Sequence, residues 1–124
     1  MFLVDDETGK ITLHSGDTGP VTYEFEGITD ESQTVVLWTM KNRSGVVVKE
    51  HLANISDGAV QIDFLNEDTD DLPAGNYPYD VRVVYKPIYD DNDRLVDADY
   101  DNGGYVFTPE SPYYVEILST VGHI

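Results

Sequence analysis

The sequence contains no cysteine, and this absence excludes several kinds of site before any motif is considered. Without thiols the chain cannot form disulfide bonds, bind zinc through thiolates or use a cysteine nucleophile. Any domain that it forms must therefore be held together by packing and hydrogen bonds alone.

Basic residues are scarce, because seven Lys and Arg stand against 24 Asp and Glu, for a formal net charge of -17. Nucleic-acid binding requires clustered Lys and Arg that neutralise phosphates, so we expect no nucleic-acid partner. An anionic membrane surface would repel the chain as well. Self-assembly would have to overcome the same repulsion through apolar contacts, cations or a basic partner.

Long apolar runs are also missing, so no segment is expected to span a membrane. The first residues, Met1-Phe2-Leu3-Val4-Asp5-Asp6-Glu7, lack the basic region and the longer apolar core of a signal peptide. We therefore expect no membrane association and no export by the general secretory route.

Short segments in which apolar and polar residues alternate recur along the chain, with turn signals between them. This period of two predicts about eight half-buried β-strands, and Asn66–Asp71 is the one place where a helical turn is expected. At 124 residues the chain is most simply one all-β domain, residues 1–124, with an ordered core at about 9–119. The expected strands lie at Ile11–Leu13, Val21–Phe25, Val35–Met40, Val46–Val48, Val60–Phe64, Tyr77–Tyr85, Tyr105–Phe107 and Tyr113–Leu118.

Two motifs occur in an order that resembles a known family. Ser15-Gly16-Asp17-Thr18-Gly19 precedes the first long strand, and Leu72-Pro73-Ala74-Gly75-Asn76-Tyr77-Pro78-Tyr79-Asp80 follows the strand that ends at Phe64. Together they resemble the immunoglobulin-like domains of tailed phages typified by the N-terminal domain of the baseplate upper protein, over residues 10–86.

The resemblance implies both a fold and a function. The fold would be an immunoglobulin-like antiparallel β-sandwich. The protein would be a non-enzymatic structural or adaptor component of a phage virion, such as its baseplate, made in the bacterial cytoplasm. Its partners would be other phage structural proteins, and it would form a homo-oligomer in the particle.

Individual residues fit such a sandwich on physical grounds. Immunoglobulin-type domains place a tyrosine two residues before the second cysteine of strand F, and its hydroxyl bonds back across the preceding corner. Tyr77 fits that position, Tyr79 falls at the cysteine position, and Trp38 suits the core tryptophan of strand C. Pro78 is a departure, because it removes a hydrogen-bond donor from the predicted strand.

The segment Pro87–Gly104 is predicted to be a long irregular loop, and it leaves the topology after Lys86 open. Within it, Asp97, Asp99 and Asp101 have the spacing of the first ligands of a calcium loop. An EF-hand is excluded because Asn102 and Thr108 stand where glycine and glutamate are required. A solvated acidic loop is the favoured interpretation, and calcium binding by Asp90–Asn102 remains an alternative.

No catalytic, cofactor-binding or metal-binding residue is assigned, and we expect no enzyme. His14, His51 and His123 are scattered without metal-ligand spacing, and Ser15, Ser44 and Ser111 lack a nucleophile-elbow context. The triplet Asp17-Thr18-Gly19 also occurs in aspartic proteases, but here it would require a homodimer that shares two aspartates.

The nine tyrosines fall into two groups. Tyr23, Tyr77, Tyr79 and Tyr85 occupy apolar-face positions and are predicted to be core residues. Tyr89, Tyr100, Tyr105, Tyr113 and Tyr114 lie near the irregular segment, where aromatic side chains can form a protein interface or a carbohydrate platform instead of ordinary packing. Ordinary sandwich packing is the favoured interpretation of these tyrosines. If they form a platform instead, a stand-alone module that binds carbohydrate or a host surface is the alternative function.

Overall fold

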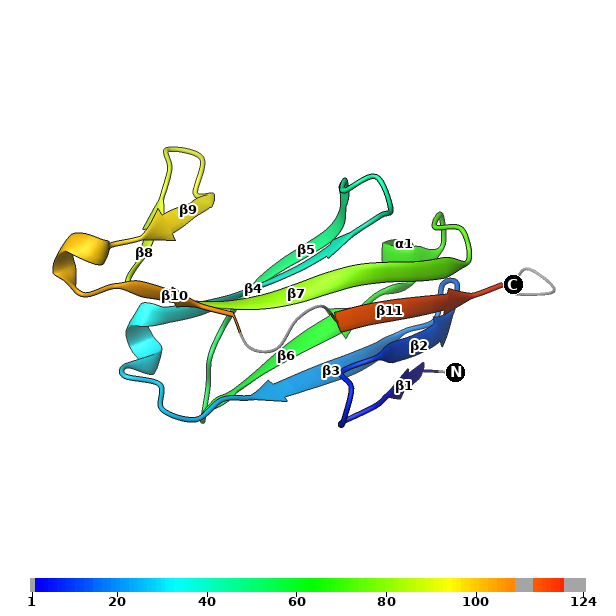
Figure 1. The fold of residues 1–124 in the computed structure, drawn as a ribbon, viewed down its shortest axis with the longest axis horizontal. Coiled ribbons are helices and arrows are strands. Elements are labelled where there is room, and N and C mark those ends of the chain that lie inside the picture. Colours follow the sequence, from blue (N-terminus) through cyan, green and yellow to red (C-terminus); the bar gives the residue numbers. More distant parts are fainter. Residues whose placement is uncertain (1, 109–112, 120–124) are drawn as a thin grey trace.

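A computed structural model describes residues 2–108 and 113–119 and shows a mostly β protein (Figure 1). One short α-helix, α1 (Asn66–Thr69), and two 3-10 turns, η1 (Glu31–Gln33) and η2 (Tyr100–Asn102), interrupt the strands. The strands are β1 (Phe2–Val4), β2 (Ile11–His14), β3 (Gly19–Glu24), β4 (Thr34–Lys41), β5 (Val47–Asn54), β6 (Ala59–Phe64), β7 (Gly75–Tyr85), β8 (Pro87–Tyr89), β9 (Leu95–Ala98), β10 (Tyr105–Phe107) and β11 (Tyr113–Leu118).

The main sheet has the strand order β1-β2-β11-β7-β4-β5, and β10 also pairs with β7. A separate pair, β3–β6, faces it, and β8–β9 form a third small sheet. The pairing of β2 with β11 is parallel, so the main sheet is mixed and not antiparallel throughout as predicted. The physical reason is that these strands come from opposite ends of the chain, so no hairpin turn forces them to run in opposite directions.

All eight predicted strands are confirmed, as is the single helical turn. The structure adds β1, β8 and β9, which brings the strands of the described residues to eleven. These additional strands have only three or four residues each. The sequence did not predict them because β1 precedes the core expected at 9–119 and the other two lie in the acidic segment expected to be irregular.

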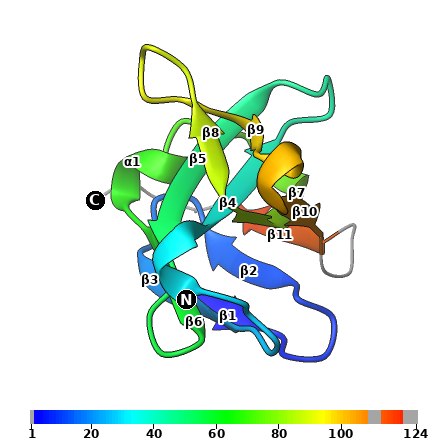
Figure 2. The ribbon, with the colours of Figure 1, turned by 90° about the vertical axis from the view of Figure 1, so that its left-hand side faces the viewer.

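The prediction that Pro87–Gly104 is an irregular loop is wrong, because the segment forms the β8–β9 hairpin followed by η2. Asp90 builds the hairpin turn by accepting hydrogen bonds from the backbone N–H groups of Asn92, at 2.8 Å, and Arg94, at 3.0 Å. Figure 2 shows the hairpin rising from the main sheet on the side away from β3–β6. A small second core, formed by Val35, Val84, Ala98 and Leu95, anchors it there.

The main core lies between the main sheet and the β3–β6 pair. At its centre the ring of Trp38 stacks on Tyr79, with ring centroids 4.9 Å apart, and meets Phe64 of β6 edge-on at 5.4 Å. The Trp38 Nε1–H donates to the Tyr23 hydroxyl at 3.1 Å, and the Tyr23 hydroxyl donates to that of Tyr79 at 3.1 Å. This chain of hydrogen bonds connects the two sheets in a protein that has no disulfide.

The corner before β7 is stabilised by a hydrogen bond from Tyr77, near the start of the strand. The Tyr77 hydroxyl donates to the backbone carbonyl of Pro73 at 2.6 Å. Pro78 lies opposite Tyr114 of β11, just beyond Tyr79, where the pairing of β7 with β4 stops. Pro78 therefore has a paired strand on one side only, an edge-like position of the kind at which proline occurs in sheets.

Replacing Tyr77 by phenylalanine tests this corner. We expect Tyr77→Phe to lower the free energy of unfolding by about 1 kcal/mol, because the ring stays buried while its hydrogen bond is lost. Chemical denaturation followed by circular dichroism measures the change. Tyr114→Phe is the matched control, since that tyrosine is 45% exposed and should change the stability by less than about 0.5 kcal/mol. Equal effects of the two variants would contradict the role given to the Tyr77 hydroxyl.

Candidate functional site

Strand β10 carries a continuous run of exposed apolar and aromatic side chains. Tyr105, Val106 and Phe107 are 37%, 38% and 54% exposed, although all three residues belong to a strand. They pair with Tyr85, Val84 and Val83 at the end of β7. Soluble proteins tolerate single exposed apolar side chains, but a contiguous patch indicates an interaction surface.

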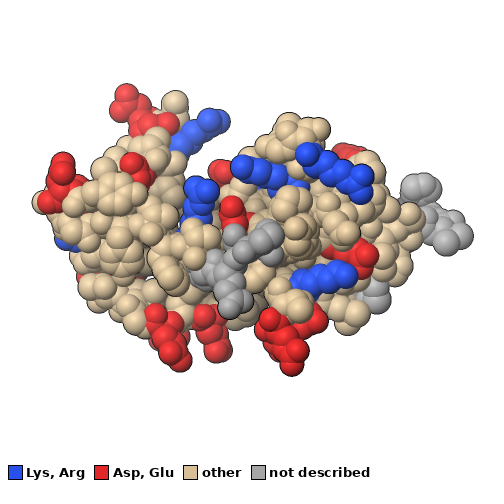
Figure 3. All heavy atoms as spheres, in the orientation of Figure 1, with Lys and Arg blue, Asp and Glu red and all other residues tan. Residues whose placement is uncertain are grey.

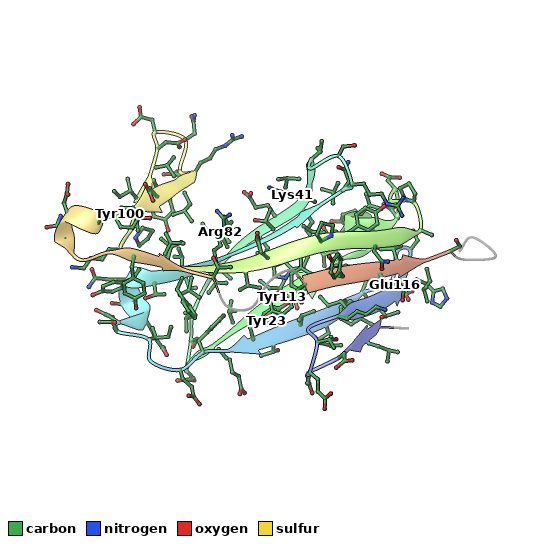
Figure 4. The ribbon with its side chains drawn as sticks, in the orientation of Figure 1. Tyr23, Lys41, Arg82, Tyr100, Tyr113 and Glu116 are labelled. Carbon is green, nitrogen blue, oxygen red and sulfur yellow. The ribbon has the colours of Figure 1, made fainter. Side chains whose placement is uncertain are left out.

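A groove of about 590 Å³ lies beside this strand. Val81 and Val83 form its floor, and Tyr113 lies at one end. The wall opposite β10 is formed by the end of β3 and the segment that follows it, from Tyr23 to Ile28. Figure 4 shows Tyr23 and Tyr113 close together between β3 and β11, whereas Arg82 and Lys41 project from the other side of the main sheet. The volume is typical of a site that receives a small ligand or a few side chains of a partner.

Two glycines set the position of β10. Gly103 ends η2 with a φ of 87°, a left-handed conformation that glycine adopts without strain. Gly104 follows, and a Cβ there would lie 2.7 Å from the backbone oxygens of both Asp99 and Tyr85. Only glycine therefore allows β10 to approach β7 so closely. The Tyr105 ring then contacts the Tyr85 ring, with centroids 5.2 Å apart, and its hydroxyl lies 3.3 Å from the Thr29 hydroxyl across the groove.

The charged groups at the groove are acidic. Glu24 and Glu26 line it and are exposed to solvent. Neither glutamate forms a salt bridge within residues 2–108 and 113–119. Figure 3 shows Lys and Arg side chains spread over the face that carries β7, with Asp and Glu side chains along the margin below it. The groove thus combines an apolar interior with a negatively charged border.

A second cleft, of about 690 Å³, lies on the outer face of the main sheet beneath the β8–β9 hairpin. Three of its lining residues, Glu50, Asp93 and Arg94, are charged, and the others are leucines and a valine. The charged residues of this cleft are thus of both signs, one cation and two anions. The groove beside β10 is the stronger candidate, because its lining is mostly apolar and its charged residues are both acidic.

The residues considered for calcium do not converge. Asp97 and Asp99 use their carboxylates locally, accepting hydrogen bonds from the Ala98 backbone at 2.9 Å and the Asn102 side chain at 2.7 Å. Hydrogen bonds from backbone N–H groups hold the pKa of Asp90 below its usual value. In the part of the chain that the structure describes, no three His, Asp or Glu side chains are arranged to hold a metal ion.

The residues considered for catalysis are dispersed as well. Asp17 accepts a hydrogen bond from the His14 backbone in the turn before β3, and the Ser15 hydroxyl donates to the Thr69 carbonyl. His51 lies on β5 opposite Trp38, and Ser44 lies in the β4–β5 turn. Ser111 and His123 are outside the described residues. Asp17 thus has a structural part in the turn that contains the Asp-Thr-Gly triplet.

The two groups of tyrosines are partly separated by burial. Tyr77 and Tyr79 are buried, and Tyr23 and Tyr85 are half-buried, as expected for core positions. The exposed ones are Tyr89, Tyr100, Tyr105 and Tyr114, whereas Tyr113 is half-buried and stacks on Tyr79. Of the exposed set, Tyr105 alone lines the groove. The sequence placed Tyr105 among the possible interface tyrosines, but it gave no sign that Val106 and Phe107 of the same strand would also be exposed.

No helix among the described residues is long and apolar enough to cross a membrane. Comparisons of the chain with protein-family models, curated proteins and solved structures found no match.

Proposed function

We propose that this protein is a non-enzymatic structural or adaptor component of a tailed-phage particle, and that it acts by docking against other particle proteins. The observation that carries the docking role is the apolar groove beside β10, where Tyr105, Val106 and Phe107 are exposed. Aromatic and apolar side chains gathered at one surface are the usual anchors of protein interfaces.

The finer fold that we propose is an immunoglobulin-like β-sandwich. The order β11-β7-β4-β5 corresponds to strands G, F, C and C′ of a variable-type domain, and β3 with β6 to strands B and E. Trp38 on β4 packs against Tyr79 on β7, as the tryptophan of strand C packs against the disulfide of antibody domains. The bond from Tyr77 back to Pro73 supports the same assignment, since it has the form of a tyrosine corner.

The phage assignment rests on the motifs that include Asp17 and Tyr77, which resemble those of phage immunoglobulin-like domains. Such a component would be present in several copies in a symmetric particle, and multiplicity would strengthen individually weak contacts. The net charge of -17 would direct it towards basic patches on its partners.

Immunogold labelling tests this proposal. Phage particles induced from the source strain are labelled with an antibody raised against this chain, and preimmune serum is the control. We expect label at a fixed place on intact particles. Unlabelled particles, with the protein found in the soluble fraction, would contradict the proposal. The stand-alone binding module, with Tyr89 and Tyr100 exposed near the β8–β9 hairpin, would then be tested on glycan arrays.

A further inference from the structure

We propose that the groove receives an extended segment of a partner protein, which adds as a strand to β10, inserts an apolar side chain and places basic residues beside Glu24 and Glu26. This inference rests on the proposed docking function and specifies the chemistry of the partner.

The first observation is the free edge of β10. The strand is paired on one side only, with β7, in the part of the chain that the structure describes. The neighbouring position is not filled by β2, because β2 pairs with Val115–Leu118 of β11 and does not extend to β10. Unpaired N–H and C=O groups along such an edge form a template for an incoming strand.

The second observation is that this edge lacks the usual protection. Natural proteins block free edges with charged side chains, proline or bulges. Strand β5, which ends the main sheet beside β4, carries Lys49, Glu50 and a bulge where it pairs with Met40 and Lys41. The residues of β10, by contrast, are all apolar or aromatic and are at least 37% exposed.

The third observation is the charge beside the groove. Glu24 and Glu26 line it without a salt bridge in the described residues. A second copy of the chain, docked through the same surface, would bring its own two glutamates and a charge of -17 against these. Like-charge contacts oppose that arrangement, whereas a segment with basic residues beside its apolar anchor is attracted.

The inference is tested with synthetic peptides and the isotope-labelled full chain at low ionic strength. The probe is the acetylated and amidated peptide Lys-Lys-Val-Thr-Phe-Thr-Val-Lys-Lys, and its acidic twin carries glutamate at every lysine. We expect the basic peptide to shift the amide resonances of Tyr105–Phe107 and Glu24–Ile28 and to slow hydrogen exchange in β10. The acidic twin should bind at least about tenfold more weakly, because it replaces attraction by repulsion.

Backbone methylation of the peptide tests strand addition on the unaltered protein. Two further peptides of the same sequence carry N-methyl groups on alternate residues. One has them on the odd-numbered residues and the other on the even-numbered ones, so each blocks one edge of the strand. Both keep the charge and the side chains. The peptide methylated on the edge that faces β10 should bind about tenfold more weakly or worse, because it loses at least two hydrogen bonds. Equal binding of both methylated peptides and the unmodified one would overturn strand addition.

Matched variants test the residues. Glu24→Gln with Glu26→Gln should weaken binding of the basic peptide roughly three- to tenfold, since two exposed charge pairs are lost. Glu67→Gln with Asp71→Asn, which removes one exposed carboxylate within α1 and one after it, should leave the binding unchanged. Phe107→Asp should abolish most binding, whereas Val96→Asp, at a site of similar exposure, should not.

Three outcomes would overturn the inference: no binding of the basic peptide, shifts confined to other surfaces, or concentration-dependent self-association through β10 in place of peptide binding. Failure of the inference can be told apart from failure of the proposed function. If particles are labelled but the peptide does not bind, strand addition at β10 is wrong and the virion role stands. If the peptide binds but particles are not labelled, the groove binds basic segments and the phage assignment is wrong.

Discussion

Trp38→Ala is expected to lower the free energy of unfolding by about 3 to 5 kcal/mol, the largest effect of any single substitution considered for this protein. Trp38 is fully buried, stacks on Tyr79, meets Phe64 of the facing sheet and donates to the Tyr23 hydroxyl. Removing the indole leaves a cavity between the sheets and takes away the donor to that hydroxyl, which keeps its hydrogen bond to Tyr79. Chemical denaturation followed by far-ultraviolet circular dichroism measures the change.

The control is Leu52→Ala on the neighbouring strand β5, where the side chain is 40% exposed and the expected loss is below about 1 kcal/mol. If Trp38→Ala does not fold, Trp38→Phe keeps part of the ring but loses the donor and should show an intermediate loss. A loss below about 1.5 kcal/mol for Trp38→Ala would contradict its place at the centre of the core.

Tyr79→Phe is expected to lower the free energy of unfolding by about 1 to 3 kcal/mol, although it removes a single oxygen atom. The Tyr79 hydroxyl accepts from Tyr23 and donates to the Gly9 carbonyl, so it connects β3, β7 and the segment before β2. Its loss leaves the Tyr23 hydroxyl without its acceptor and the Gly9 carbonyl without the Tyr79 donor. Tyr85→Phe on the same strand is the matched control, because that hydroxyl makes no hydrogen bond within the described residues. A similar loss in both variants would contradict this role.

The same hydroxyl also predicts a dependence on alkaline pH. Burial raises the pKa of Tyr79, and that of Tyr23, above the ordinary value of 10.0. Above about pH 10 the unfolded chain loses these protons while the folded protein keeps them, so the stability falls as the pH rises. It is unaffected by these groups below pH 10. Above pH 10 the free energy of unfolding should fall less steeply with pH in Tyr79→Phe than in the unaltered protein, by up to about 1.4 kcal/mol per pH unit. Equal slopes in the two proteins would contradict the burial of the Tyr79 hydroxyl.

The sequence predicted the local elements of the fold well, because the period of two reports directly which residues of a strand face the core. The strands that contain Trp38, Phe64 and Tyr79, and the turn at Pro73, could be placed for that reason. The hairpin at β8–β9 could not, since its strands are short and its acidic residues resemble a solvated loop. Its anchoring residues Val84 and Ala98 acquire their role only when the main sheet is assembled.

The candidate site was predicted less well. Tyr105 was among the tyrosines suggested for an interface, but Phe107 and the glutamates Glu24 and Glu26 were not. Alternation assigns a face to each side chain and does not say whether another strand covers that face. The groove exists because β3 ends at Glu24 while β7 continues to Tyr85, and this difference in length becomes visible only when the sheets are placed against each other.

By itself, then, the sequence determined eight of the eleven strands of the described residues, which of their residues face the core, the acidic charge and the absence of any disulfide. The tertiary structure decided the parallel pairing of β2 with β11, the position of the β8–β9 hairpin and the exposed edge of β10. The reason is that hydrophobic periodicity is a local property of one strand, whereas strand order and edge exposure depend on which distant segments pair and where each pairing ends.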